Sequence, residues 1–139
     1  SNGSLQIVRF DAAGNLDPTF GPAGTGSFYQ DWGTAVYQAC LALQGNGELL
    51  VGGFYRTSSF QTPNASGDVF LARLHSGGTL DTAFGTAGKC SFPVDSDARI
   101  GSLAAQRVGD EFRCVLTFTI SHNVYFNNTD DGNWMVRFR

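Results

Sequence analysis

Residues 9–24 read RFDAAGNLDPTFGPAG and residues 73–88 read RLHSGGTLDTAFGTAG, so one pattern occurs twice at a spacing of 73 − 9 = 64 residues. Both copies carry an arginine, a glycine, a Leu-Asp pair, a Phe-Gly pair and an Ala-Gly pair in the same register. A repeat of this kind is typical of proteins built from stacked supersecondary units. The sequence therefore predicts two successive copies of one structural unit.

A third copy begins at the end of the chain, because Arg137 lies another 137 − 73 = 64 residues further on. We predict one repeat region over residues 1–139, with units at about 5–68 and 69–132 and a third unit begun at 133–139. The positions that define the repeat are Arg9, Gly14, Leu16, Asp17, Phe20 and Gly21 in the first copy, Arg73, Gly78, Leu80, Asp81, Phe84 and Gly85 in the second, and Arg137 in the third.

The repeat positions have ordinary structural interpretations. Gly14 and Gly78 suit a tight turn that requires a positive φ. Asp17-Pro18-Thr19-Phe20-Gly21 predicts a short helical turn, with Asp17 as its N-cap and Gly21 ending it in the left-handed region. Leu16 and Phe20 are expected to fill apolar space beneath this turn. Capping explains Asp17 and Asp81 without any bound metal.

Periodicity predicts short strands and no helix longer than a single turn, which makes the fold class all-β. In the strand over 37–44, Ala39, Leu41 and Leu43 share one face, and the turn at 45–47 joins it to the next strand. The predicted strands cover residues 5–10, 26–30, 37–44, 49–55, 69–74, 89–93, 100–106, 112–119 and 134–139.

The middle of the unit repeats more loosely. Residues 41–44 (LALQ) match residues 103–106 (LAAQ) at a spacing of 62, whereas Val51 and Phe54 match Val115 and Phe118 at a spacing of 64. These spacings predict a two-residue insertion in the turn at 110–113 of the second copy.

The arginine, Gly-x-Leu-Asp, Phe-Gly and Val-Gly-Gly segments together resemble the bacterial delta-60 repeat family. The resemblance covers nearly the whole chain, from Leu5 to Arg139. It implies β-propeller blades like those of larger, usually exported or surface-located proteins, and hence an extracellular, cell-surface or periplasmic location. It implies no catalytic residues for this chain.

On this interpretation the chain holds about two blade-equivalents. It begins at the third strand of one blade, contains one complete blade, and ends at the third strand of the next. Two blades cannot close a ring, because propellers need at least about four. We expect the blades to pack against other copies of the chain or against the rest of a longer propeller chain.

Composition excludes some other classes. The formal net charge is −3 and the nine basic residues are scattered, so we expect no nucleic-acid partner, and no apolar run is long enough to span a bilayer. Cys40, Cys90 and Cys114 form no CxxC pair, which argues against zinc. They are interpreted as small buried residues, and a Cys90–Cys114 disulfide is the alternative.

Two long connections, 56–68 and 120–133, occupy equivalent places in successive units and combine aromatic, amide and carboxylate side chains. Such a mixture suits a glycan or protein ligand. The candidate ligand-binding residues are Phe60, Asn64, Asp68, Tyr125, Phe126, Asn128, Asp130 and Asp131. We expect no cofactor, although the sequence Asp130-Asp131-Gly132-Asn133 leaves a Ca²⁺ site as an alternative.

No catalytic motif occurs. His75 takes the turn position of Asp11, and neither His75 nor His122 has a partner at ligand spacing, so no metal site is expected. Trp32 and Trp134 are predicted to lie in the core or between blades. The leading functional hypothesis is a non-catalytic binding or scaffold module. A purely structural segment of a larger repeat protein and a hydrolase site formed only on ring closure remain alternatives.

Overall fold

The computed structural model describes residues 4–32, 35–57, 66–94, 97–121 and 132–138; for Asp97, Ser121 and residues 132–138 only the backbone is considered. All regular elements are antiparallel strands except one 3₁₀ helix, η1 (Pro22–Gly24). Among the described residues, no helix has the length and apolar character needed to cross a membrane. The predicted all-β class is confirmed.

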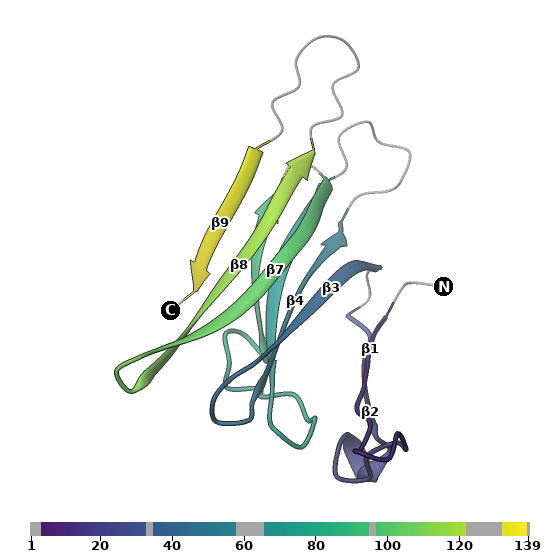
Figure 1. Cartoon of the computed structure of the whole chain (residues 1–139). Helices are drawn as coiled ribbons and strands as arrows, with labels where there is room; N and C mark the ends of the chain where they lie inside the picture. The colour runs from purple at the N-terminus through teal and green to yellow at the C-terminus, as the bar shows by residue number, and fades with distance from the viewer. Residues whose placement is uncertain (1–3, 33–34, 58–65, 95–96, 122–131, 139) are drawn as a thin grey trace.

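The described strands form three sheets (Figure 1). The first pairs β1 (Leu5–Val8) with β2 (Ser27–Gln30). The central sheet runs β3 (Val36–Leu43), β4 (Leu49–Arg56), β5 (Gly67–Leu74) and β6 (Lys89–Val94) in sequence order. The third joins β7 (Asp97–Val108), β8 (Glu111–Ser121) and β9 (Gly132–Phe138). These are the third and fourth strands of one blade, a whole blade, and the first three strands of another, as the sequence predicts.

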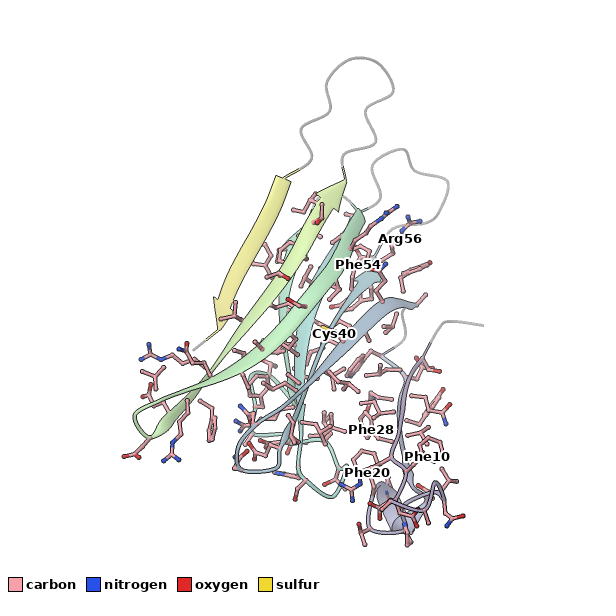
Figure 2. All side chains as sticks on the ribbon, viewed as in Figure 1. Phe10, Phe20, Phe28, Cys40, Phe54 and Arg56 are labelled. Atoms are coloured by element: carbon pink, nitrogen blue, oxygen red, sulfur yellow. The ribbon has the colours of Figure 1, made fainter. Side chains whose placement is uncertain are left out.

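Apolar layers hold the sheets together face to face (Figure 2). Between the first and central sheets, Leu5, Ile7 and Phe28 pack against the Val51 and Phe70 side of the central sheet. Between the central and third sheets, the buried residues are Phe54, Val69, Val94, Ala98, Leu116 and Phe118. Strands β4 and β5 of the central sheet are therefore buried on both faces, and this explains why they are almost continuously apolar.

The two apolar positions of the repeat turn differ in burial. Phe20 is fully buried between the first and central sheets, whereas Leu16 is 52% exposed. Leu80, which corresponds to Leu16, packs against the same apolar layer as Phe20. The expectation that Leu16 fills apolar space is thus wrong. The apolar layer that buries Phe20 lies on one face of the β1–β2 sheet, and Leu16 lies on the opposite face.

Strand β8 is shifted by one residue relative to the sequence repeat. In the central sheet, Arg73 pairs with Leu50. In the third sheet, Arg137 pairs with Val115, although the residue 64 positions after Leu50 is Cys114 (50 + 64 = 114). The alignment of β4 with β8 therefore needs a spacing of 65 instead of 64.

This shift turns every side chain of β8 to the opposite face. Phe54 points toward the third sheet, but Phe118 points toward the central one, so the predicted match of these two residues is wrong. The physical reason is burial: the shift places Leu116 and Phe118 in the apolar layer, and it leaves Thr117 to bond Ser102 on the outer side.

The connecting turn is correspondingly longer than predicted. Leu41 pairs with Val51, and Leu103 pairs with Leu116, so the spacing is 103 − 41 = 62 in the first strand and 116 − 51 = 65 in the second. The insertion is 65 − 62 = 3 residues, not two. It extends the β7–β8 hairpin to a turn at Gly109, which has a φ of 64°.

Candidate functional site

The turn after β1 is reproduced bond for bond after β5. In the first copy, the Gly14 N–H donates to the Asp11 carbonyl at 3.1 Å and the Asp17 N–H donates to the Arg9 carbonyl at 3.0 Å. The corresponding bonds of the second copy, from Gly78 to His75 and from Asp81 to Arg73, measure 2.8 and 2.9 Å. Gly14 and Gly78 have φ angles of 84° and 79°, as predicted.

The segment that follows forms the single turn that the sequence predicts. The Phe20 N–H donates to the Asp17 carbonyl at 3.1 Å, and the 3₁₀ helix begins only at Pro22. Asp17 does act as a cap would, because its carboxylate accepts the Thr19 N–H at 2.8 Å. A hydrogen bond between residues i and i + 3 closes one turn, and Gly21, with a φ of 82°, then changes the direction of the chain.

In the first copy, these side chains hold the turn of the next repeat. The Arg9 guanidinium donates through Nε to Asp17 at 2.7 Å and through Nη1 to the Ser76 carbonyl at 2.7 Å. The Gly21 N–H donates to the Gly77 carbonyl at 2.8 Å. We call Arg9, Asp17 and Gly21 the first turn socket; it binds two consecutive carbonyls of the Ser76–Gly77 turn.

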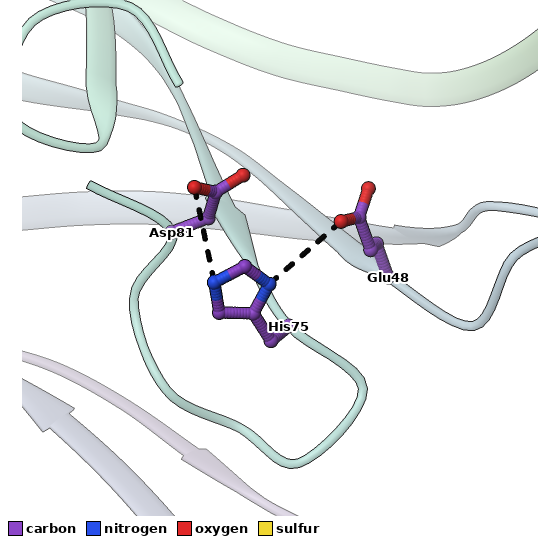
Figure 3. A group of neighbouring side chains, drawn as sticks. All are labelled: Glu48, His75 and Asp81. Atoms are coloured by element: carbon purple, nitrogen blue, oxygen red, sulfur yellow. Dashed lines mark ion pairs between the residues drawn. The ribbon is translucent and has the colours of Figure 1, made fainter. Parts of the chain in front are cut away.

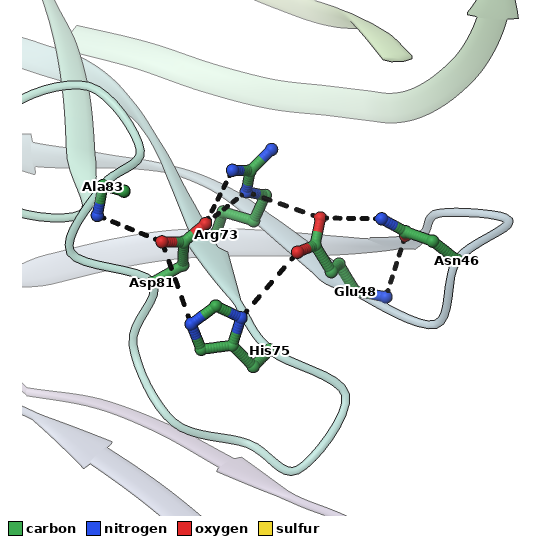
Figure 4. Close-up of polar contacts among 6 residues, drawn as sticks. All are labelled: Asn46, Glu48, Arg73, His75, Asp81 and Ala83. Carbon is green, nitrogen blue, oxygen red and sulfur yellow. Dashed lines mark hydrogen bonds and ion pairs between the residues drawn. The ribbon is translucent and has the colours of Figure 1, made fainter. Parts of the chain in front are cut away.

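The second copy builds the same set from Arg73, Asp81 and Gly85, which we call the second turn socket (Figure 4). Arg73 donates through Nε to Asp81 at 2.8 Å, and its Nη2 lies 2.6 Å from the same oxygen. Its guanidinium lies over Phe84, as that of Arg9 lies over Phe20. Among the described residues, neither Arg73 Nη1 nor the Gly85 N–H contacts a carbonyl of a following turn.

A second strand supplies a group that the repeat lacks elsewhere. Glu48, immediately before β4, brings its carboxylate near His75 and Asp81 (Figure 3). His75 Nδ1 lies 3.7 Å from Glu48 Oε1, and His75 Nε2 lies 3.8 Å from Asp81 Oδ1. The expectation that His75 has no partner is therefore wrong, because its partners come from different segments of the chain.

Ligand atoms of Glu48, His75 and Asp81 lie within 4.8 Å of one another, so these residues are the described group with the spacing to hold a metal ion. The arrangement differs from a ligand set in two respects. Each histidine nitrogen faces a different carboxylate, and Arg73 neutralises Asp81 at 2.6 Å and lies 3.6 Å from Glu48. The geometry is that of an ion-pair network around Arg73.

The same contacts set the ionisation of the two turn aspartates. Hydrogen bonds from Thr19 and Arg9 lower the pKa of Asp17. Burial by itself raises the pKa of Asp81, but the bonds from Arg73 and from the Ala83 N–H outweigh it, so the net shift is downward. Both carboxylates are therefore charged at neutral pH and act as fixed acceptors for their arginines.

A second polar group lies between the first and central sheets. The Tyr55 hydroxyl donates to Asp68 at 2.8 Å, and Lys89 Nζ lies over the Tyr55 and Trp32 rings at 4.7 and 5.2 Å from their centroids. Trp32 also meets Phe70 edge-on, which confirms its predicted place between blades. Burial and Asp68 raise the pKa of Tyr55, whereas burial lowers that of Lys89.

Asp68 is the candidate loop residue that the structure describes, and it lies inside β5, which begins at Gly67. The other candidates lie outside the described residues: Phe60, Asn64, Tyr125, Phe126, Asn128, Asp130 and Asp131. So do His122 and the acidic pair proposed for Ca²⁺. The strands that flank the two connections meet at the same end of adjacent sheets (Figure 1). In the central sheet β4 ends and β5 begins there, and in the third sheet β8 ends and β9 begins there. Ligand binding by these residues stays a prediction.

All three cysteines are free, so the alternative of a Cys90–Cys114 disulfide is not realised. Cys114 is buried, and Cys40 and Cys90 are half-buried. Burial raises the pKa of each thiol, which agrees with the interpretation of these residues as small apolar side chains.

The four-stranded antiparallel meander, stacked between parts of two similar sheets, defines the chain as a set of β-propeller blades; the described residues form no closed ring. Residues 1–20 and 44–84 match the model of a family described as "Domain of unknown function (DUF5122) beta-propeller". This match agrees with the resemblance of the sequence to the delta-60 repeat family. No curated protein and no solved structure matches the chain.

Proposed function

We propose that this chain is a non-catalytic scaffold or binding module that associates with further blades of its own repeat type. One observation carries the proposal. Leu41 and Leu43 on β3 are 51% and 69% exposed, although they point to the same side of the central sheet as the buried Val51. The opposite side of β3, with Cys40 and Ala42, packs against β7.

The uncovered side of β3 forms a groove with β1. A hollow of about 310 Å³ lies between the two strands, lined by residues of β1, by Ala39 and Leu41 of β3, and by Val51 of β4. Within the described residues, β1 pairs only with β2, so its other edge has open backbone groups. In the central sheet, the corresponding edge of β5 pairs with β4. The groove thus corresponds to the place of the first two strands of a blade.

The partner that fits this groove is a hairpin of two strands with an apolar face. Its inner strand would pair with the open edge of β1, and its apolar side chains would cover Leu41 and Leu43. Strand addition of this kind supplies main-chain hydrogen bonds, and alternate side chains supply specificity. The family resemblance supports an extracellular or surface location for such a module.

The test is sedimentation velocity of the full chain over a concentration series. We expect concentration-dependent association that the double variant Leu41→Gln/Leu43→Gln weakens by at least about tenfold, because it removes two apolar side chains from the contact. The control is Val108→Gln, since Val108 is 36% exposed at the far end of the β7–β8 hairpin. Association that the β3 substitutions leave unchanged would refute the proposal.

A further inference from the structure

We infer that Asn46 is a site of spontaneous modification: the backbone nitrogen of Gly47 attacks its side-chain amide, and the acid that results displaces Glu48 from its ion pairs. Residues 45–47 read Gly-Asn-Gly and form the turn between β3 and β4. Asn46 is exposed, so water reaches its side chain. The inference concerns the chemistry of this one turn and does not rest on the proposed function.

The reaction needs water as its co-reactant. The Gly47 nitrogen forms a bond to the side-chain carbonyl carbon of Asn46, the bond from that carbon to the amide nitrogen breaks, and ammonia leaves with the proton that Gly47 loses. Water then opens the cyclic imide at either of its carbonyls and leaves an aspartate or an isoaspartate at this position. Asparagine and water thus give an acidic residue and ammonia, without oxidation or reduction.

The turn favours the attack in two ways. Gly47 has no Cβ to hinder the approach of its nitrogen, and its φ of 87° lies in the region that glycine adopts freely. The Glu48 N–H donates to Asn46 Oδ1 at 3.2 Å, which polarises the carbonyl and stabilises the negative oxygen that forms during the attack. The hydrogen bond that has to open runs from the Gly47 N–H to the Gln44 carbonyl at 2.9 Å, at the end of the hairpin.

Asn15 provides an internal comparison, because it also lies exposed in a turn. The residue that follows it is Leu16, whose branched side chain hinders the approach of the backbone nitrogen. A difference between Asn46 and Asn15 therefore reports on the residue that follows and not on exposure. Asn2-Gly3 is a further Asn-Gly pair of the sequence but lies outside the described residues, so the modified position has to be assigned by peptide mapping.

The acid produced at this position faces the Glu48 carboxylate (Figure 4). Asn46 Nδ2 donates to Glu48 Oε2 at 3.0 Å, and hydrolysis replaces this nitrogen by a carboxylate oxygen. A hydrogen bond thereby becomes a repulsion between two negative groups. Glu48 Oε2 also lies 3.6 Å from Arg73 Nε, and Glu48 Oε1 lies 3.7 Å from His75 Nδ1. When Glu48 turns away from the new charge, it leaves both partners.

The affected turn adjoins the contact between the first and central sheets. A Cβ built on Gly47 would lie 3.4 Å from the Ser76 Cβ, and the Ser76 carbonyl accepts the hydrogen bond from Arg9. An isoaspartate also adds a methylene group to the main chain and lengthens the turn. We therefore expect the modified chain to be less stable than the original one.

The first experiment follows the full chain in water enriched in heavy oxygen, at mildly alkaline pH, by peptide mapping with mass spectrometry. We expect the amide at position 46 to be lost, with one heavy oxygen incorporated, before any loss at Asn15. The control is Asn46→Gln, which keeps an amide but closes the larger ring far more slowly. An Asn46 amide that persists longer than that of Asn15 overturns the inference.

The second experiment uses Asn46→Asp as a homogeneous form of the product. We expect its melting temperature at neutral pH to be about 2–4 °C lower than that of the original chain. The same substitution made together with Glu48→Gln, and compared with Glu48→Gln alone, should lower it by no more than about half as much, because the repulsion needs both charges. No fall, or an equal fall in the two backgrounds, overturns the displacement of Glu48.

Discussion

Phe20 and Phe84 occupy the same position of the repeat, yet the structure predicts that their replacement has unequal effects. Phe20 is fully buried between two sheets, and its ring lies against Gly78 and under the Arg9 guanidinium. Phe84 is only half-buried beneath Arg73. A comparison of Phe20→Ala with Phe84→Ala therefore measures how much the contact between neighbouring repeats stabilises the fold.

For a fully buried phenylalanine, truncation to alanine costs about 3–5 kcal/mol. Half burial roughly halves this figure, so Phe84→Ala is expected to cost about 1.5–2.5 kcal/mol. With a urea m-value of about 2 kcal/mol/M, the unfolding midpoint falls by about 2 M for Phe20→Ala and by about 1 M for Phe84→Ala.

The assay is equilibrium urea unfolding of dilute protein, followed by tryptophan fluorescence and circular dichroism, with unchanged m-values as the check that both variants keep the same unfolding transition. Equal losses at the two positions would refute the reasoning, because they would mean that the neighbouring turn does not bury Phe20.

Two further predictions concern close packing and pH. Gly53→Ala should destabilise the fold by about 1–3 kcal/mol, because its Cβ would lie 2.4 Å from Phe70 Cε1 and 2.7 Å from the Gln38 carbonyl oxygen; Gly45→Ala, whose nearest neighbour is 3.7 Å away, is the control in the same melt. Because the pKa of Asp81 is lowered in the folded protein, its charged carboxylate stabilises the fold. This stabilisation is fully present above the ordinary aspartate pKa of 3.8 and is lost as the pH falls through the folded-state pKa. Asp81→Asn should therefore lower the melting temperature at neutral pH and flatten its decline in acid, and parallel pH profiles for both proteins would contradict this.

Most of the fold could be predicted from the sequence because the repeat constrains it twice. The strands of the central sheet and the glycine turns follow from local signals that do not depend on tertiary contacts: alternation, Gly-rich turns and a capping aspartate. The β8 register could not be predicted, since residues 115–118 read equally well with either face inward. Burial of Leu116 and Phe118 decided it, and burial is a property of the packed sheets.

The candidate site, like the fold, could be predicted only in part from the sequence. Arg9, Asp17 and their counterparts are visible as a pattern in the sequence, but the pattern does not say that Arg9 reaches Ser76, a residue 67 positions away. Glu48 was missed altogether, because the repeat does not preserve it: its counterpart at the spacing of 65 is Arg113. The available signal was that the second turn replaces Asp11 by His75, a change that calls for an acidic partner from elsewhere.

The repeat arginine forms an ion pair with the aspartate that follows the turn, and the geometry gives it a further role. Only one of its three nitrogens is needed for the aspartate at 2.7 Å; another carries the next repeat through a main-chain carbonyl. A main-chain acceptor imposes no side-chain requirement on the neighbouring turn. What the socket does require is a turn of fixed shape, and Gly14 and Gly78 supply it through their positive φ. The contact between these repeats therefore depends on backbone shape, and Gly78→Ala, whose Cβ would lie 2.6 Å from Phe20, should disrupt it more than Gly77→Ala, whose Cβ would lie 3.9 Å from its nearest neighbour.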